Sequence, residues 1–199
     1  MSGRPWDASY RADEPAPWDL GEPQPAVVRL VESGAFVGSV LDAGCGVGDN
    51  AVFIATHGDV AVVGVDVAET ALAIARAKAE ARGVAIEFAV ADAFALERLG
   101  RGFDTVLDSG LFHAFDDEER ARYAANLAAV TKPGGTVFVL CFGDEGDDVG
   151  PHPVSRSQVH AAFRDDSGWR VVSIEPQRIH TNFHGPEGAP AWLAKIRRA

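Results

Sequence analysis

Short apolar runs alternate with helix-like segments along most of the chain, and this alternation limits the folds open to it. Each run has the length and the Val, Ile and Leu content of a buried strand. Five strands are predicted in the middle of the chain, at 39–45, 60–67, 85–92, 103–110 and 136–142, with helices at 48–58, 68–83 and 116–132. Strands and helices in alternation predict a parallel α/β sheet covered on both faces, and right-handed crossovers make it doubly wound.

The two ends of the chain are less regular. A helix is predicted to begin near Pro23 and to stop at Gly34. After an acidic loop, the pattern predicts a helix at 155–165 and two more strands, at 169–179 and 191–199. We therefore expect one domain over residues 1–199, divided into a lead-in at 1–22, a core at 23–142 and a C-terminal part at 143–199.

The composition is that of a globular, acidic protein, with 47% hydrophobic residues and a net charge of −11. Such a charge argues against binding to nucleic acid or to an anionic membrane surface. Cys45 and Cys141 both lie in apolar runs, and two buried thiols fit a reducing compartment. The N-terminus has no apolar signal region and no apolar run could cross a bilayer, so we expect a cytoplasmic protein, either a monomer or a homodimer.

A glycine-rich turn follows the first predicted strand, in the segment LDAGCGVGDN. Gly44, Gly46 and Gly48 let the chain turn sharply and bring backbone amides close to a ligand, although such a turn can also be only a tight turn. A dinucleotide-binding turn has the pattern G-x-G-x-x-G, and its last glycine admits a pyrophosphate. Here Asp49 takes that place and Asp42 precedes the glycines. Carboxylates repel a pyrophosphate and attract an ammonium or sulfonium, so the pattern favours S-adenosylmethionine over NAD.

Three more strands end in an aspartate. Asp66 ends the second strand, where a carboxylate can accept both ribose hydroxyls of either cofactor. Asp92 ends the third strand, where it is expected to meet the adenine amino group while Ala93 offers its amide; the alternative for Asp92 is a helix cap. Asp108 and Ser109 end the fourth strand beside the reactive end of the cofactor, although a lone aspartate there is often a loop anchor.

Five segments resemble, in order and spacing, the motifs of class I S-adenosylmethionine-dependent methyltransferases. They are VLDAGCGVGDN, VVGVDV, FAVADAF, FDTVLDSGLFHAF and LAAVTKPGGTVFVLCF, and together they cover residues 39–142. The resemblance implies a Rossmann-like sheet of seven strands with the last strand antiparallel and helices on both faces. It also implies in-line methyl transfer to a small-molecule acceptor, with S-adenosylhomocysteine as the product.

The segment PWDLGEPQP, residues 17–25, resembles the lead-in of the thiol, halide and thiopurine methyltransferases. It is also similar to that of bacterial enzymes that methylate phenolic, quinone-like or hydroxyquinolone acceptors. In this group the tryptophan and its surrounding segment fold over the cofactor, which implies a lid at Trp18. The residues expected to contact the cofactor are Trp18, Asp42, Gly44, Cys45, Gly46, Gly48, Asp49, Asn50, Asp66, Val67, Asp92, Ala93, Asp108 and Ser109.

His113 follows the fourth strand on the side where the acceptor is expected, which makes it a candidate general base or acceptor contact. A phenol or a hydroxy-heterocycle gains from such a base, whereas a thiol or halide does not need one. The alternative is that the His113 ring packs between phenylalanines and bonds a backbone carbonyl. The residues expected to contact the acceptor are Phe112, His113, Phe142, Tyr10 and Trp6.

Two other functions are compatible with parts of this pattern. A methyltransferase-like fold can bind S-adenosylmethionine without catalysis, and an NAD-dependent oxidoreductase shares the acid at the second strand end. His180 and His184 are four residues apart, but glycine and proline follow them, so no helix is expected to direct both at one metal ion. We expect no metal site.

Overall fold

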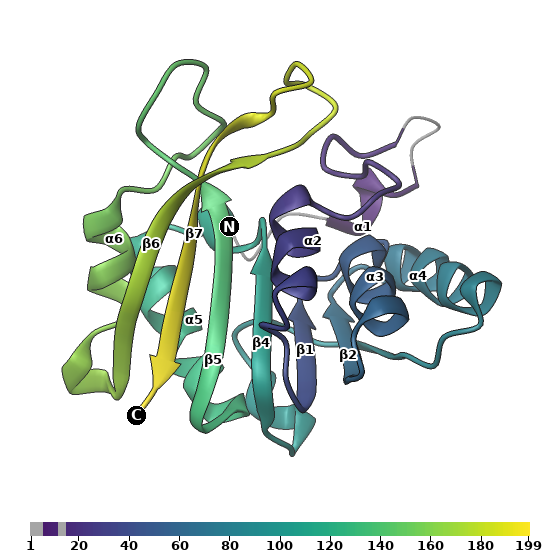
Figure 1. Cartoon of the computed structure of the whole chain (residues 1–199), viewed down its shortest axis with the longest axis horizontal. Helices are drawn as coiled ribbons and strands as arrows, with labels where there is room; N and C mark the ends of the chain where they lie inside the picture. The colour runs from purple at the N-terminus through teal and green to yellow at the C-terminus, as the bar shows by residue number, and fades with distance from the viewer. Residues whose placement is uncertain (1–5, 12–14) are drawn as a thin grey trace.

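The computed structural model describes residues 6–11 and 15–199, and a seven-stranded sheet forms its centre (Figure 1). Residues 1–5 and 12–14 of the expected lead-in lie outside the described residues. The strands are β1 (Ser39–Ala43), β2 (Ala61–Asp66), β3 (Glu87–Val90), β4 (Phe103–Ser109), β5 (Thr131–Phe142), β6 (Trp169–Ile179) and β7 (Ala189–Arg198). The helices are α1 (Trp6–Ser9), α2 (Pro25–Glu32), α3 (Asp49–His57), α4 (Glu69–Arg82), α5 (Asp117–Val130) and α6 (Arg156–Ala162), with short 3₁₀ turns η1 (Leu96–Leu99), η2 (Phe112–Ala114) and η3 (Asp165–Ser167).

The strand order is β3-β2-β1-β4-β5-β7-β6. β1 pairs in parallel with both β2 and β4, so the chain winds outward in one direction from β1 and then in the other. β7 runs antiparallel to its neighbours β5 and β6, and the predicted sheet of seven strands with the last one antiparallel is confirmed. The order of winding reverses between β1 and β4, and a doubly wound sheet opens a ligand crevice at such a point.

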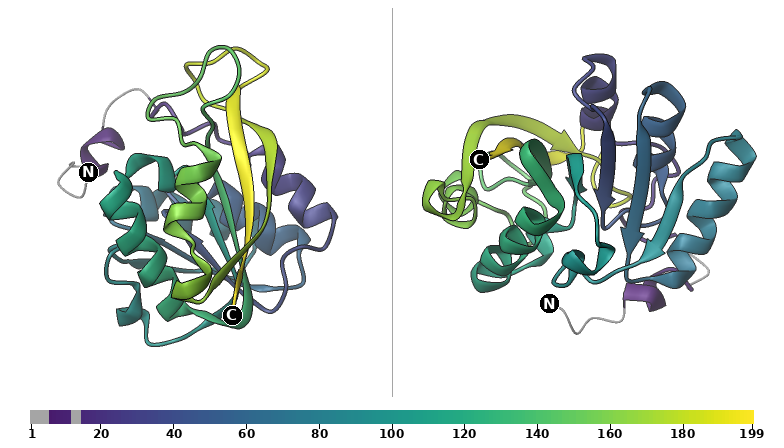
Figure 2. Two further views of the ribbon diagram at one scale, coloured as in Figure 1. Left: turned by 90° about the vertical axis from the view of Figure 1, so that its left-hand side faces the viewer. Right: turned by 90° about the horizontal axis from the view of Figure 1, so that it is seen from below.

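Helices cover both faces of the sheet, as predicted (Figure 2). On one face, Val27 of α2, Ile54 of α3 and Leu72 of α4 pack against apolar side chains of β1 and β2. On the other face, α5 and α6 form the larger core, with Tyr123 and Phe163 buried in it. Burial of this kind is the main stabilising contribution to a sheet whose strands are apolar on both sides.

The glycine turn begins earlier than predicted. β1 ends at Ala43 because Gly44 has a φ of 73°, and the amides of Gly44 and Cys45 both donate to the Val65 carbonyl, at 2.8 and 2.9 Å. Cys45 is therefore half-buried in the turn and does not belong to the strand, which corrects the expectation of a fully buried thiol; Cys141 is buried in β5.

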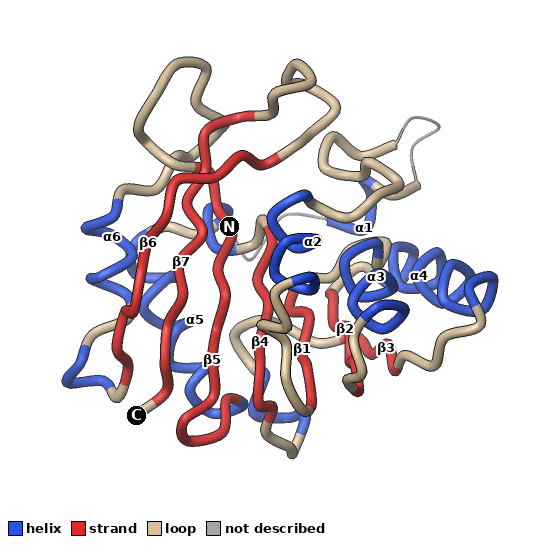
Figure 3. The backbone as a smooth tube through the Cα atoms, in the orientation of Figure 1, coloured by secondary structure: helices blue, strands red, loops and turns tan. Residues whose placement is uncertain are grey.

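The loops after the carboxyl ends of the parallel strands gather at one edge of the sheet (Figure 3). Two long loops rise above this edge, at 143–154 between β5 and α6 and at 180–188 between β6 and β7. The lead-in reaches the same edge from the other side, next to α2. In the part of the chain that the structure describes, no helix combines the length and the apolar character needed to span a membrane.

Candidate active site

A cavity of about 400 Å³ lies at this edge, above the point where the sheet reverses its order. Its volume is within the usual range for small-molecule sites, about 300–1,000 Å³. The residues predicted as contacts that line it are Trp6, Tyr10, Trp18, Gly44, Cys45, Gly46, Asp49, Asn50, Asp66, Val67, Ala93, Ser109, His113 and Phe142. The structure therefore brings together residues from positions 6 to 142 of the chain around one space.

Five predicted contacts do not line the cavity: Asp42, Gly48, Asp92, Asp108 and Phe112. A Cβ atom on Gly48 would lie 2.7 Å from the Ala75 Cβ, so this glycine allows α3 and α4 to approach closely. Phe112 is fully buried in the core and stacks on Phe163, a placement that does not fit contact with an acceptor. The Asp92 carboxylate is exposed and accepts a hydrogen bond from the Phe94 amide at 2.9 Å.

Asp66 connects the glycine turn to the end of β2. Its carboxylate accepts one hydrogen bond from the Gly46 amide and one from the Ala68 amide, each at 2.9 Å. Burial raises the pKa of Asp66, while these amides act in the opposite direction. A carboxylate has about four acceptor sites, so these bonds leave acceptor capacity on Asp66, which lines the cavity.

The negative charge of Asp49 is balanced by a nearby lysine, which its position in the motif does not indicate. Lys78 of α4 binds its Oδ1 at 2.7 Å and lies 4.0 Å from Asp19 Oδ1 in the lead-in. The repulsion of a pyrophosphate therefore cannot be assigned to Asp49 alone. It depends on the whole set of acids around the cavity.

Asp42 and Asp108 lie beneath the cavity floor, on the adjacent strands β1 and β4, and both are buried. Burial raises the pKa of Asp42 to about 8 and the pKa of Asp108 to about 7. Among the described residues, Asp42 Oδ2 has no hydrogen-bond partner, whereas the Tyr123 hydroxyl lies close to the Asp108 carboxylate and lowers its pKa against the effect of burial. Asp108 Oδ1 accepts from the amides of Leu111 and Phe112, at 3.0 and 3.2 Å, and so fixes the turn that carries His113.

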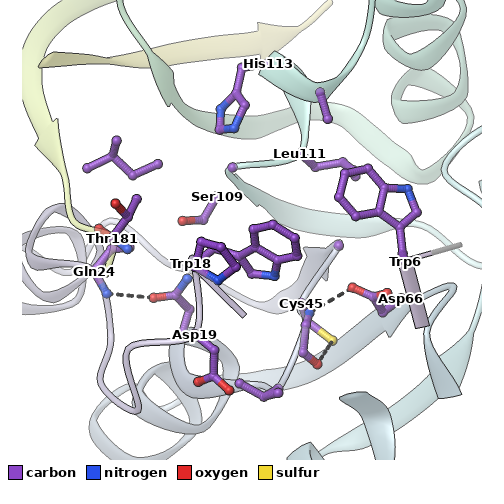
Figure 4. Close-up of a pocket in the computed structure, with 18 of the residues that line it drawn as sticks. Trp6, Trp18, Asp19, Gln24, Cys45, Asp66, Ser109, Leu111, His113 and Thr181 are labelled. Carbon is purple, nitrogen blue, oxygen red and sulfur yellow. Dashed lines mark hydrogen bonds between the residues drawn. The ribbon is translucent and has the colours of Figure 1, made fainter. Parts of the chain in front are cut away.

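Three aromatic side chains of the lead-in, Trp6, Tyr10 and Trp18, cover one side of the cavity, and we call them the aromatic lid. Trp18 Nε1 donates to the Tyr10 hydroxyl at 2.8 Å, and Trp6 meets the Trp18 ring edge-on at 5.7 Å. The Tyr10 hydroxyl lies above the glycine turn, 3.0 Å from where a Cβ of Gly46 would stand. In Figure 4, Trp18 lies across the middle of the view, with Asp66 and Cys45 on one side and His113 and Ser109 on the other.

Two residues that were not predicted as contacts, Asn182 and Gln24, connect residues 16–24 to the 180–188 loop. Asn182 donates from its backbone amide to the Pro17 carbonyl at 2.7 Å, and from its side chain to the carbonyls of Ala16 and Asp19, at 3.3 and 2.8 Å. The Gln24 side chain exchanges two hydrogen bonds with the His180 backbone, both at 2.9 Å. These contacts join segments more than 150 residues apart, a relation that single-sequence patterns do not contain.

His113 stands at the opposite end of the cavity from the glycine turn (Figure 4). Its Nδ1 accepts a hydrogen bond from the Phe142 amide at 3.3 Å, and its ring lies 4.4 Å from the Phe142 ring. Burial lowers the pKa of His113 to about 3, and His152 and Arg120 act in the same direction. The imidazole is therefore neutral at physiological pH.

The charged residues are unevenly distributed around the cavity. Its described lining contains four acids, Asp19, Glu22, Asp49 and Asp66, and no lysine or arginine. From Ser109 onward the lining contains four histidines and no carboxylate. One end of the cavity is thus suited to a cation, and the other is free of negative side chains. Across residues 6–11 and 15–199, no three His, Cys, Asp or Glu side chains are grouped as a metal site.

Comparison with known proteins agrees with this geometry. A family described as a methyltransferase domain matches residues 40–135. The 2-heptyl-1-hydroxyquinolin-4(1H)-one methyltransferase of Mycobacteroides abscessus is 36% identical over 96% of this chain and 88% of its own length. The probable thiol methyltransferase 2 of Arabidopsis thaliana is 35% identical over 85% of this chain and 75% of its own.

Solved structures show the same fold. One, from work on the conversion of a disulfide bond into a thioacetal group during echinomycin biosynthesis, matches with a TM-score of 0.86 and 35% identity, over 97% of this chain and 90% of that one. Magnesium protoporphyrin IX methyltransferase from Synechocystis PCC 6803, solved with S-adenosylmethionine bound, matches with a TM-score of 0.65 over 87% of this chain and 76% of that one. At 23% identity, this second likeness shows the fold alone.

Proposed function

Because the chain belongs to the class I S-adenosylmethionine-dependent methyltransferases, we propose that it methylates an oxygen or sulfur atom of a small aromatic molecule. The observation that carries the proposal is the cavity itself. It places the glycine turn and Asp66 at one end and the ring pair His113–Phe142 at the other, beneath the aromatic lid. The relatives named for a hydroxyquinolinone and for thiols support an acceptor of this kind.

The residues at the acidic end fit S-adenosylmethionine better than NAD. A pyrophosphate would meet four carboxylates there and, among the described lining residues, no lysine or arginine to balance it. A sulfonium and an ammonium, by contrast, are attracted by the same acids. The sequence pattern assigned this attraction to Asp42 and Asp49, but Asp42 is buried and does not line the cavity, and the charge of Asp49 is balanced by Lys78.

Several residues are placed to hold the cofactor. The free acceptor sites of Asp66 can receive the ribose hydroxyls, and the small apolar residues Ala91 and Ala93 leave a slot at the end of β3 for a flat ring. When bound, S-adenosylmethionine supplies a methyl group on a positively charged sulfur. The aromatic lid keeps water away from that end of the cavity and offers ring faces to the cation.

Three parts of the chain contribute different functions to the proposed site. In our proposal, residues 1–22 form the lid, 23–142 bind the cofactor, and 143–199 complete the acceptor side while they add the last two strands of the sheet. The enzyme's main task is to align donor and acceptor, which contributes up to about 7–11 kcal/mol in favourable cases.

Ligand-dependent unfolding tests the cofactor. S-adenosylhomocysteine at one hundred times its Kd should stabilise the protein by about 2.7 kcal/mol, and NAD should not. A higher unfolding midpoint with NAD alone would contradict the proposal. Incubation with methyl-labelled cofactor and a panel of phenols, hydroxyquinolones, thiols and iodide then tests turnover. Label transfer to none of them, with S-adenosylhomocysteine bound, would indicate a binding protein without this activity.

A further inference from the structure

The hydrogen bond between Phe142 and His113 determines which ring nitrogen of His113 carries a proton. The Phe142 amide has only a donor to offer, so Nδ1 must present its lone pair to it. A neutral imidazole has one N–H and one lone pair, and the N–H is therefore on Nε2. In this arrangement the nitrogen that remains for the cavity is a hydrogen-bond donor.

The surroundings of His113 keep it in this form. Arg120 of α5 lies behind the turn, with its Nε on the Phe112 carbonyl at 3.3 Å and its Nη1 paired with Asp117 at 2.8 Å. His152, from the 143–154 loop, is the other group whose charge acts on His113. A histidine that serves as a base commonly has a carboxylate bonded to its ring, which orients it and stabilises its protonated form. Two carboxylates close to this turn have other partners: Asp108 accepts from the Leu111 and Phe112 amides, and Asp117 pairs with Arg120.

We propose that His113 holds the acceptor as a hydrogen-bond donor, and that the enzyme acts on small hydroxy- or N-hydroxy-heteroaromatic compounds that are already anions at neutral pH. This inference rests on the proposed methyl transfer. An anionic oxygen can accept the Nε2–H bond with one lone pair and attack with another. In the step, the bond from the methyl carbon to the sulfonium sulfur breaks, sulfur keeps the electron pair, and a carbon–oxygen bond forms. No proton moves, since the acceptor lost its proton to solvent before binding.

The acceptor end of the cavity suits an anion. Its described lining from Ser109 onward has no carboxylate. Two further histidines reach this end from loops: His152, which is exposed, and His184, whose Nδ1 bonds the Thr181 hydroxyl at 2.7 Å. Both are included in the test, because either is an alternative base.

The test compares pentafluorophenol, 4-nitrophenol and phenol, whose pKa values lie below, near and above neutrality. The pH at which kcat/KM reaches half its maximum should follow the pKa of each acceptor, with a fall of about tenfold per pH unit below it. A single midpoint shared by the three acceptors would overturn the inference. So would the loss of this pH dependence in His113→Asn, His152→Gln or His184→Gln.

A pair of substitutions separates a donor from a base. Asn at position 113 can still accept from the Phe142 amide but loses the distal donor, and kcat/KM should fall roughly tenfold to hundredfold with no change in the pH midpoint. His113→Gln restores a distal N–H without a basic group and should recover part of the loss. Equal losses in both variants, accompanied by a shifted midpoint, would identify a base. His57→Gln, on the exposed end of α3, is the matched control.

Binding of 4-nitrophenol to the S-adenosylhomocysteine complex needs no turnover and distinguishes this inference from the proposed function. The visible band of the bound ligand should be that of the phenolate, at pH values where most of the free compound is still protonated. A bound neutral phenol would overturn the inference even if methylation is observed. Phenolate binding that weakens in His113→Asn would support it even if methylation fails.

Discussion

Replacing Asp108 with asparagine should stabilise the protein at neutral pH, and the gain should grow as the pH rises toward about 7 and then stay constant. Burial raises the pKa of Asp108 from 3.8 to about 7, in spite of two amide hydrogen bonds. At pH values between these two pKa values, Asp108 is protonated in the folded protein and ionised in the unfolded chain. The stability of the wild type therefore falls as pH rises from about 4 to about 7, and above that range this group has no further effect.

The size of the effect follows from the same values. At about 1.4 kcal/mol per pH unit, a pKa raised from 3.8 to about 7 corresponds to a loss of roughly 4 kcal/mol in the free energy of unfolding. Asparagine keeps an oxygen for the Leu111 and Phe112 amides and places an NH₂ close to the Tyr123 hydroxyl, which interacts with the Asp108 carboxylate in the wild type. The exchange of an oxygen for an NH₂ at this position adds a contribution to stability that does not depend on pH.

Urea unfolding of both proteins, from about pH 5 to about pH 8, measures the difference. The stability of Asp108→Asn relative to the wild type should increase by roughly 3 kcal/mol over this range. Asp104, on the same strand, is the control, because its ion pair with Lys132 at 2.7 Å holds its pKa well below the usual range. Asp104→Asn should reduce stability about equally at every pH tested. A difference for Asp108→Asn that stays constant with pH would refute the reasoning.

Three other substitutions test the site. Trp18→Ala removes the hydrogen bond to Tyr10 and part of the aromatic lid. The Kd for S-adenosylhomocysteine, measured by calorimetry, should rise about tenfold while the unfolding midpoint stays the same. An unchanged Kd would show that Trp18 does not contribute to binding. Asp66→Asn should weaken the same ligand by roughly tenfold to hundredfold, and equal affinity would remove Asp66 from the site. Asn182→Ala should raise KM for the acceptor and speed exchange of the Asp19 amide, which is bonded to the Ala16 carbonyl. Unchanged exchange would contradict the proposed connection.

The fold and the cofactor end were predictable because they depend on local patterns. A strand that ends in a glycine turn, followed by a helix, places Gly44, Gly46 and Asp66 at one edge of the sheet in any doubly wound topology. Most strand boundaries moved by a residue or two, as where the hydrogen bond from Gly44 to Val65 ended β1 early. The exception is β5, which begins at Thr131, five residues before the predicted strand, so that Thr131 and Lys132 belong to β5 and not to the predicted helix. Local signals determine which residues lie near the cavity, but not which way each side chain points.

The remaining features depend on contacts between distant segments. Gly48 and Phe112 have the residue types of a binding site, but packing against Ala75 and Phe163 occupies them. The pairing of Asp49 with Lys78 joins two helices and changes the charge argument drawn from the motif. The hydrogen bond from the Phe142 amide to His113 Nδ1 likewise depends on how the turn after β4 meets β5. This bond determines the tautomer of the imidazole, and so whether Nε2 is a hydrogen-bond donor or acceptor.

The reversed direction of β7 has a practical consequence for experiments on this protein. Because β7 runs against the parallel strands, it carries the chain away from the cavity, and Ala199 lies at the opposite edge of the sheet (Figure 1). A purification tag or a surface linkage at the C-terminus is thereby kept far from the ligands. At the other end of the described chain, Trp6 itself belongs to the aromatic lid, so an N-terminal addition would lie only a few residues in sequence from the cavity. Binding and turnover should therefore be measured on protein tagged or immobilised through its C-terminus.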